Sequence, residues 1–175
     1  NDGLLDLYVS DFQGAGDHIW HNDGDGFLEA VSDRVGITAS TQRVLSFGGG
    51  FFDYDNDGYL DLFIANSPLY HGFENTAPDI HYKQINSLFH NERNGKFKDV
   101  TPTAGVGFSI PRLGRGAAFA DFDNDGHLDI VVANNGDQPL LLRNSGGAGN
   151  NCLNLKRGGT RSNRDAMGAE ISIKA

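Results

Sequence analysis

The hydrophobic positions of this chain follow the pattern of short β-strands. Apolar and polar residues alternate over residues 5–9, and apolar runs rich in β-branched and aromatic residues occupy 60–64 and 128–132. A period of two over five or six residues is typical of strands. No stretch repeats its apolar residues with the 3.6-residue period of an amphipathic helix. The pattern therefore predicts an all-β chain.

The predicted strands recur in three similar units. In each unit an apolar strand is followed by a second apolar strand, a hairpin turn, a third strand ending near Ile37 or Val106, and a glycine-rich strand at 48–52 or 116–120. The second strands all end in asparagine, namely Asn22, Asn91 and Asn144. Asp-Gly and Asn-Gly pairs predict two-residue hairpin turns, at Asp25-Gly26 and Asn94-Gly95.

Four short strands per unit are typical of a propeller blade. A closed propeller needs at least about four blades, so residues 1–144 are expected to form an open arc of about 2.5 to 3 blades. Asn1 aligns with Asn56 and Asn124 in the other units, so the first unit begins part-way through the pattern. We therefore expect this chain to be a fragment of a longer protein.

The segments that precede the first strand of each unit carry the candidate chemistry. Residues 53–61 (the second acidic loop) and 121–129 (the third acidic loop) read D-x-D-x-D-G-x-x-D, and residues 1–6 (the first acidic loop) repeat the second half of that pattern. Oxygen ligands at every second position of a tight turn suit a hard cation such as Ca²⁺, and the glycine permits the sharp turn.

The expected ligands are the carboxylates at positions 1, 3, 5 and 9 and the backbone carbonyl at position 7. They are Asp53, Asp55, Asp57, Tyr59 (carbonyl) and Asp61 in the second acidic loop, Asp121, Asp123, Asp125, His127 (carbonyl) and Asp129 in the third, and Asp2, Leu4 (carbonyl) and Asp6 in the first. The apolar residues at positions 8, 10 and 12 are expected to face a core, with the aspartate at position 9 turned toward the ion.

Two other interpretations compete with a calcium loop between strands. An EF-hand closes its shell with a glutamate at position 12, where this chain has Ile64 and Val132. A bare Asp/Gly-rich turn that binds nothing is the other alternative. Four unpaired carboxylates in so few residues repel one another without a cation, and this repulsion favours the calcium loop.

The acidic charge of the chain is concentrated in these loops. The formal net charge is −9, and ten of the 23 acidic residues lie in the three acidic loops. This distribution argues against a general acidic tail, and the acidic excess argues against a nucleic-acid partner. No stretch is long and apolar enough to span a membrane. Sites of this kind suit a calcium-rich setting, either secreted or extracellular, periplasmic or at the cell surface.

An insertion and a basic segment stand outside the repeat. The second unit carries extra residues within 67–84, rich in aromatic residues and histidines. Such an insertion suits a protein or carbohydrate partner, and a passive loop packed on its own blade is the alternative. Near the C-terminus, basic residues cluster at 156–164, either as an anion site or as a solvated turn. Cys152 cannot form an internal disulfide, and a small buried side chain is favoured over a reactive thiol.

The last part of the chain changes character. Residues 145–149 are typical of a flexible linker, and 150–175 contain two alternating strands around a polar turn. The sequences 150–155 and 159–169 closely resemble the start of an ASPIC/UnbV domain, N-N-W-L followed by G-T-x-S-N-R-D-A-I-G-A. The chain departs from that pattern at Cys152 and Met167, and both changes keep an apolar residue.

The acidic loops and glycine-rich strands resemble FG-GAP (VCBS-type) repeats, which in integrin α-subunits form a seven-bladed calcium-binding propeller. The combination with an ASPIC/UnbV segment is similar to the cartilage acidic protein family and its secreted bacterial relatives. The resemblance implies a secreted, calcium-stabilised binding or adhesion module. The alternative is a propeller-type lyase or hydrolase with its catalytic residues in other blades, although the chain has no G-x-S-x-G, H-E-x-x-H or phosphate-loop motif.

Overall fold

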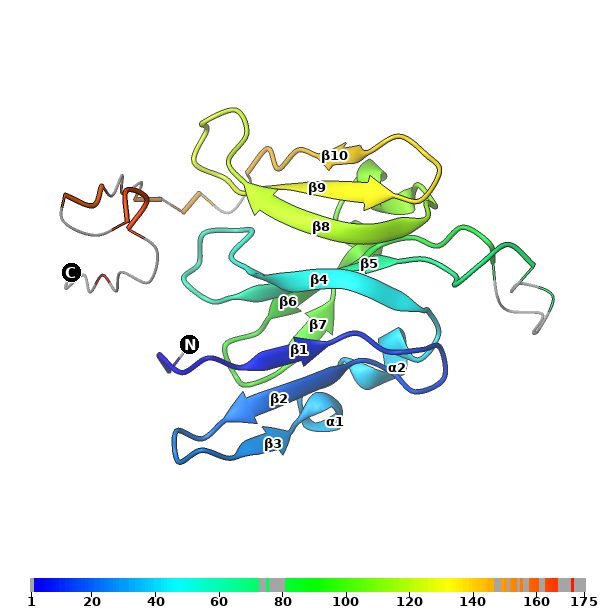
Figure 1. The fold of residues 1–175 in the computed structure, drawn as a ribbon, viewed down its shortest axis with the longest axis horizontal. Coiled ribbons are helices and arrows are strands. Elements are labelled where there is room, and N and C mark those ends of the chain that lie inside the picture. Colours follow the sequence, from blue (N-terminus) through cyan, green and yellow to red (C-terminus); the bar gives the residue numbers. More distant parts are fainter. Residues whose placement is uncertain are drawn as a thin grey trace.

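The fold of the chain was obtained as a computed structural model, shown in Figure 1. The structure describes residues 2–72, 75, 81–146, 149–150, 152–153, 155, 158–160, 163–166 and 171. Fourteen of the 26 residues in 150–175 lie outside these ranges, so the predicted division at 145–149 and 150–175 stays a prediction.

Three antiparallel sheets stand beside one another, and the fold is nearly all-β as predicted (Figure 1). Together they form an arc of propeller-like blades. The first sheet has the order β1 (Leu7–Val9), β2 (His18–Asn22), β3 (Leu28–Ala30). The middle sheet has the order β4 (Ser46–Phe52), β5 (Asp61–Asn66), β6 (Ser87–Asn91), β7 (Phe97–Asp99). The last sheet has the order β8 (Gly114–Ala120), β9 (Asp129–Asn134), β10 (Leu140–Leu142).

The third strands of the first and second units are shorter than predicted, because helical turns replace their second halves. In the first unit β3 is followed by α1 (Ser32–Val35) and α2 (Thr38–Thr41), and in the second unit β7 is followed by η2 (Thr101–Thr103) and η3 (Val106–Ser109). These turns are held by hydroxyl groups. The Leu88 N–H donates to the hydroxyl of Thr101 (2.9 Å), and Ser32 accepts from Ile19 in the same way (2.8 Å). In both units the side-chain hydroxyl accepts the backbone N–H that a carbonyl of the third strand would accept if the strand continued.

The hairpin connections are also longer than the predicted two-residue turns. The last cross-strand pairs are Asn22 with Leu28 and Asn91 with Phe97, so residues 23–27 and 92–96 make the turns. The Asn22 side chain accepts the N–H of Gly24 (3.0 Å), and Asn91 accepts that of Arg93 (3.0 Å). A turn of this type satisfies the backbone with the asparagine side chain, which explains why the second strands end in asparagine.

Strand β5 of the middle sheet is buried on both faces, although the sequence pattern predicted a single core face for it. Every residue of β5 is buried. Leu62 and Ile64 pack against the first sheet, whereas Phe63 and Ala65 pack against the last sheet. At position 8 the prediction was wrong for Leu60, which is 44% exposed, but Leu128 is partly buried and packs against the core. Buried and exposed residues do not alternate along β5, because a neighbouring sheet covers each of its faces.

The outer sheets keep one uncovered face. In β9, Ile130 and Val132 are buried against the middle sheet, while Val131 between them is 41% exposed. In β1 the prediction was wrong, because Leu7 and Val9 at positions 10 and 12 are 47% and 40% exposed and Tyr8 between them packs toward the middle sheet. Buried and exposed residues therefore alternate where a sheet has one neighbour, but the side on which that neighbour lies decides which residues are buried, so the predicted residues face the core in β9 and face outward in β1.

Glycines in β4 allow the sheets to approach one another closely. A Cβ atom on Gly48 would lie 2.6 Å from the Cα of Gly116 in β8, and one on Gly50 would lie 2.9 Å from the ring of Phe119. Any larger residue at either position would force the middle and last sheets apart.

The loops at the two ends of the sheets differ in kind (Figure 1). The second and third acidic loops join β4 to β5 and β8 to β9 at the end of the sheets where the first acidic loop also lies. The insertion joins β5 to β6 at the opposite end. None of the helices in the described ranges has the length and apolar character needed to cross a bilayer.

Candidate metal centre

The second acidic loop is folded by hydrogen bonds from its own backbone to its carboxylates. Asp53 at position 1 accepts the N–H groups of Asp57 (3.0 Å) and Gly58 (2.9 Å). Asp57 at position 5 accepts the N–H of Tyr59 at position 7 (2.8 Å). The loop turns at Asn56 and Gly58, which both have positive φ, 56° and 86°. Asparagine and glycine tolerate this conformation best.

The third acidic loop repeats the same bonds. Asp121 accepts the N–H groups of Asp125 (3.0 Å) and Gly126 (3.0 Å), and Asp125 accepts that of His127 (3.0 Å). Asn124 has a φ of 58°, close to that of its counterpart in the second loop. The shared motif therefore dictates one backbone geometry in both loops.

The aspartate at position 9 ties each loop to the second strand of its unit. Asp61 is fully buried and accepts the N–H groups of Asn91 (2.8 Å) and Tyr54 (3.1 Å). The Asn91 side chain donates in return to the carbonyl of Leu60 (3.0 Å). Equivalent bonds join Asp129 to Asn144 (2.7 Å) and Asp6 to Asn22 (2.9 Å).

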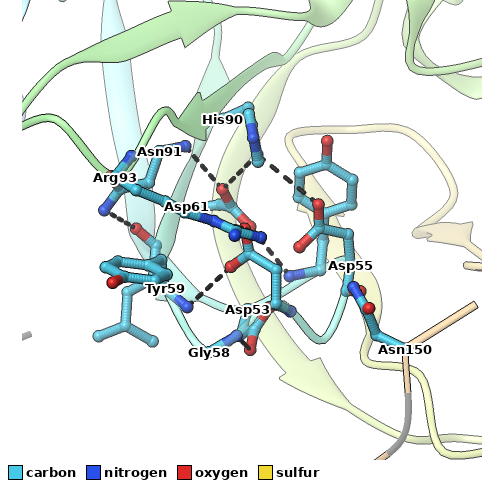
Figure 2. A network of polar contacts seen from close by, with 12 residues as sticks. Asp53, Asp55, Gly58, Tyr59, Asp61, His90, Asn91, Arg93 and Asn150 are labelled. Atoms are coloured by element: carbon cyan, nitrogen blue, oxygen red, sulfur yellow. Dashed lines mark hydrogen bonds and ion pairs between the residues drawn. The ribbon is translucent and has the colours of Figure 1, made fainter. Parts of the chain in front are cut away.

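The carboxylates at positions 1, 3 and 9 converge in both complete loops (Figure 2 shows the second). One oxygen from each of Asp53, Asp55 and Asp61 lies within 4.8 Å of the others, as do oxygens of Asp121, Asp123 and Asp129. Figure 2 shows Asp55 turned toward His90. These groups of three oxygens could hold a metal ion.

The second loop has an oxygen that its protein environment leaves unsatisfied. Oδ1 of Asp55 is buried and has no hydrogen-bond partner among the described residues. Burial and the nearby charge of Asp57 raise the pKa of Asp55. Burial also raises the pKa of Asp61 to about 6. A cation held here would satisfy this oxygen and offset the repulsion between the carboxylates.

The carboxylate at position 5 has a different partner. In the second loop, Arg93 donates to Asp57 from Nε (2.9 Å) and Nη2 (2.8 Å). Burial works against the charged form of Asp57, but the bonds from Tyr59 and Arg93 outweigh it and lower its pKa. Asp57 lies outside the group formed by positions 1, 3 and 9, although it forms a second group with Asp55 and His90.

Histidine 90 faces the second acidic loop, which sequence reasoning did not predict. Its Nδ1 lies 3.1 Å from Asp61 and 3.8 Å from Asp55 (Figure 2). His90 immediately precedes Asn91, the asparagine that ends the second strand of its unit. In the other two units the residue before the equivalent asparagine also faces the acidic loop. His21 lies 2.9 Å from Asp6, and Arg143 pairs with carboxylates of the third loop. This shared position in the repeat was the feature of the sequence from which the contact of His90 with the acidic loop could have been predicted.

Arg143 gives the third loop a different electrostatic environment. Its Nε pairs with Asp123 at position 3, and its Nη2 lies 3.4 Å from Asp125 at position 5. The bond to Asp123 and the nearby carboxylates raise the pKa of Arg143, so its guanidinium stays protonated. Asp123 and Asp125 are both exposed.

The first acidic loop shows the half of the arrangement that its sequence contains. The N–H of Leu4 donates to Asp2 (2.9 Å), as position 7 does to position 5 in the complete loops. His21 lies 3.9 Å from Asp2. No group of three ligand atoms is formed by the described residues of this loop.

The second and third loops lie against each other and against the chain after β10. The side chain of Asn56 donates to the carbonyl of Gly126 (3.0 Å), that of Asn144 to Tyr54 (2.6 Å), and that of Asn150 to Asp55 (3.0 Å). The second loop therefore contacts both the third loop and residues that follow β10. Cys152 also lies in the chain after β10. It was predicted to be a small buried side chain, but it is exposed, so that prediction was wrong.

Comparison with known proteins agrees with this repeat geometry. A family model described as "FG-GAP-like repeat" matches residues 1–64 and 53–132. Cartilage acidic protein 1 of Mus musculus is 49% identical over 61 residues, and the Homo sapiens protein is 48% identical over 61 residues. The Xenopus tropicalis protein is 44% identical over 59 residues. The mouse and human matches cover 34% of this chain but only 9% of each relative.

Proposed function

This chain belongs to the FG-GAP-like repeat family, and we propose that it is a calcium-stabilised binding module of the extracellular space. The second and third acidic loops each hold one Ca²⁺ in this proposal. The observation that carries it is the convergence of three carboxylates in each loop, together with the buried, unpartnered oxygen of Asp55. Hard oxygen ligands of this number suit calcium better than a soft transition metal.

The residues at positions 1, 3 and 9 would hold the ion, with position 5 and the carbonyl of position 7 completing the shell. When bound, calcium supplies positive charge that neutralises the carboxylates. The chain supplies the fixed geometry: Asp53 holds the turn from inside, and Asp61 joins it to β6 through Asn91. Calcium that binds only the folded chain stabilises it, by about 2.7 kcal/mol per site at a hundredfold excess over Kd.

Substitution Asp55→Asn tests this role, because it keeps the size of the side chain and removes its charge. In chelator we expect unchanged or slightly higher stability, since the repulsion with Asp57 is removed. In calcium we expect the loss of about 2.7 kcal/mol at a hundredfold excess over Kd. Thermal melts in both conditions measure the difference, with the exposed Asp33→Asn as a charge-matched control. Equal effects of Asp55→Asn in calcium and in chelator would contradict the proposal.

The proposed calcium sites and the family support an extracellular setting. Sites built from exposed loops and few carboxylates are filled at the high calcium concentrations found outside cells. The matched relatives are named for cartilage. A binding role is proposed in preference to catalysis because the carboxylates that converge do so inside the metal loops.

The partner surface proposed for this module is the insertion end, opposite the acidic loops. Leu69 and Tyr70 are 42% and 56% exposed there, while Arg115 fixes the backbone beneath them by donating to the carbonyls of Pro68 and Leu69. Exposed aromatic and apolar groups on a rigid base suit a protein or carbohydrate partner.

Shortening the insertion tests this surface. Gln84 is buried and accepts the N–H of Leu45 (3.2 Å), so the deletion should stop before it. Replacement of residues 70–82 by a short Gly-Ser linker is expected to abolish binding to matrix extracts and glycan arrays. The calcium-dependent melt should be unchanged. A partner that binds both forms equally would place its site elsewhere.

A further inference from the structure

We infer that Arg143 is a tethered cation that competes with calcium in the third acidic loop, so that the two complete loops bind calcium unequally. This inference rests on the proposed function, because it concerns the affinity of the same loops. The second loop is then the tighter site, and the third loop is the weaker one.

The competing contact is at position 3. In the third loop the guanidinium of Arg143 pairs with Asp123 and lies 3.4 Å from Asp125. The equivalent Asp55 has a buried oxygen with no hydrogen-bond partner in the described chain. An ion entering the third loop must therefore displace or share a permanent positive charge at position 3. At that position the second loop presents only the imidazole of His90, 3.8 Å from Asp55.

The difference comes from one side chain at a shared place in the repeat. His90 and Arg143 both precede the strand-ending asparagine. The shorter imidazole of His90 reaches position 9, 3.1 Å from Asp61. The longer side chain of Arg143 extends to positions 3 and 5 and carries a permanent charge.

The second loop also has an arginine, but it pairs with position 5 alone and not with positions 1, 3 or 9. Arg93 donates with both of its bonds to Asp57 at position 5. It therefore lies beside the group formed by Asp53, Asp55 and Asp61, and offsets part of the negative charge without occupying that group. Arg143 instead pairs with a member of the corresponding group in the third loop, Asp123.

The expected competition is modest because the ion pair is open to solvent. The side chains of Arg143 and Asp123 are 62% and 30% exposed, and exposed pairs contribute little to stability. We expect removal of the guanidinium to tighten calcium binding in the third loop by about tenfold, equivalent to about 1.4 kcal/mol.

Calcium titration calorimetry on the full chain tests the inference. In an Asp55→Asn background, which leaves the third loop as the site, Arg143→Gln is expected to lower the calcium Kd by about tenfold. Arg143→Lys, which keeps the charge, should stay within about threefold of the parent, a small free-energy difference. Arg93→Gln is the matched control on the other loop and should leave the third site unchanged.

The outcomes separate this inference from the proposed function. Calcium binding that is unaffected or weakened by Arg143→Gln would overturn the inference and leave calcium binding intact. The absence of binding heat in the parent chain and all variants, with circular dichroism showing folded protein, would overturn the proposed function and this inference with it.

Discussion

The second and third units share a sequence motif and a backbone geometry, but they differ in the burial and the charge environment of equivalent residues, which depend on the neighbouring sheets and loops. The motif gives both acidic loops the same turn, with Asp53 and Asp121 each accepting two backbone N–H groups. The side chain of position 5 is 2% exposed at Asp57 but 28% exposed at Asp125. The repeat pattern therefore specifies local structure, while the adjacent sheets and loops specify burial and charge.

The strands show the same contrast between the two units. Phe63 and Val131 occupy the same position in β5 and β9. Phe63 is fully buried between the middle and last sheets, whereas Val131 faces outward. A core position in one unit is thus a surface position in the other, without any change in the hydrophobic pattern that predicts the strand.

The largest expected effect comes from this strand position. Phe63→Ala should lower the free energy of unfolding by about 4 kcal/mol, because it removes a fully buried ring and leaves a cavity. Val131→Ala should cost under about 1 kcal/mol, since the side chain already contacts solvent. Urea denaturation followed by circular dichroism measures both.

Phe63→Leu serves as the control, because it keeps an apolar side chain and should cost less than Phe63→Ala. Similar losses for Phe63→Ala and Val131→Ala would contradict the account. That result would mean that the outward face of the last sheet is covered in solution.

A smaller effect is expected where the two units are alike. Asp53→Ala and Asp121→Ala each remove a carboxylate that accepts two backbone N–H groups. In chelator each should lower the free energy of unfolding by about 2 kcal/mol, the scale of charge-assisted hydrogen bonds. The matched Asn variants keep one acceptor oxygen and should cost about half as much. A loss confined to one loop would show that the shared bonds do not contribute equally.

The sequence was sufficient to predict what depends on local chemistry. The all-β class, the three units and the second strands ending near asparagine follow from periodicity and turn residues. The acidic loops of 53–61 and 121–129 fold back on their own carboxylates because aspartate, asparagine and glycine at fixed spacing satisfy the backbone of the turn. Such features need only neighbours within a few residues.

The sequence was insufficient where distant residues decide the outcome. Double-sided burial of β5 depends on the sheets on either side of it. The helical turns after β3 and β7 depend on Ser32 and Thr101 bonding to a neighbouring strand. The facing of His90 and Arg143 toward the acidic loops requires the pairing of β6 with β5 and of β10 with β9. No local pattern contains these contacts.

Calorimetric titration of the full chain with calcium tests the central claim most directly, with magnesium as the competing ion. The account predicts two saturable sites of unequal affinity, selective for calcium, with the tighter site lost in Asp55→Asn. A folded chain that binds no calcium, or one whose binding is unchanged by Asp55→Asn, would contradict it.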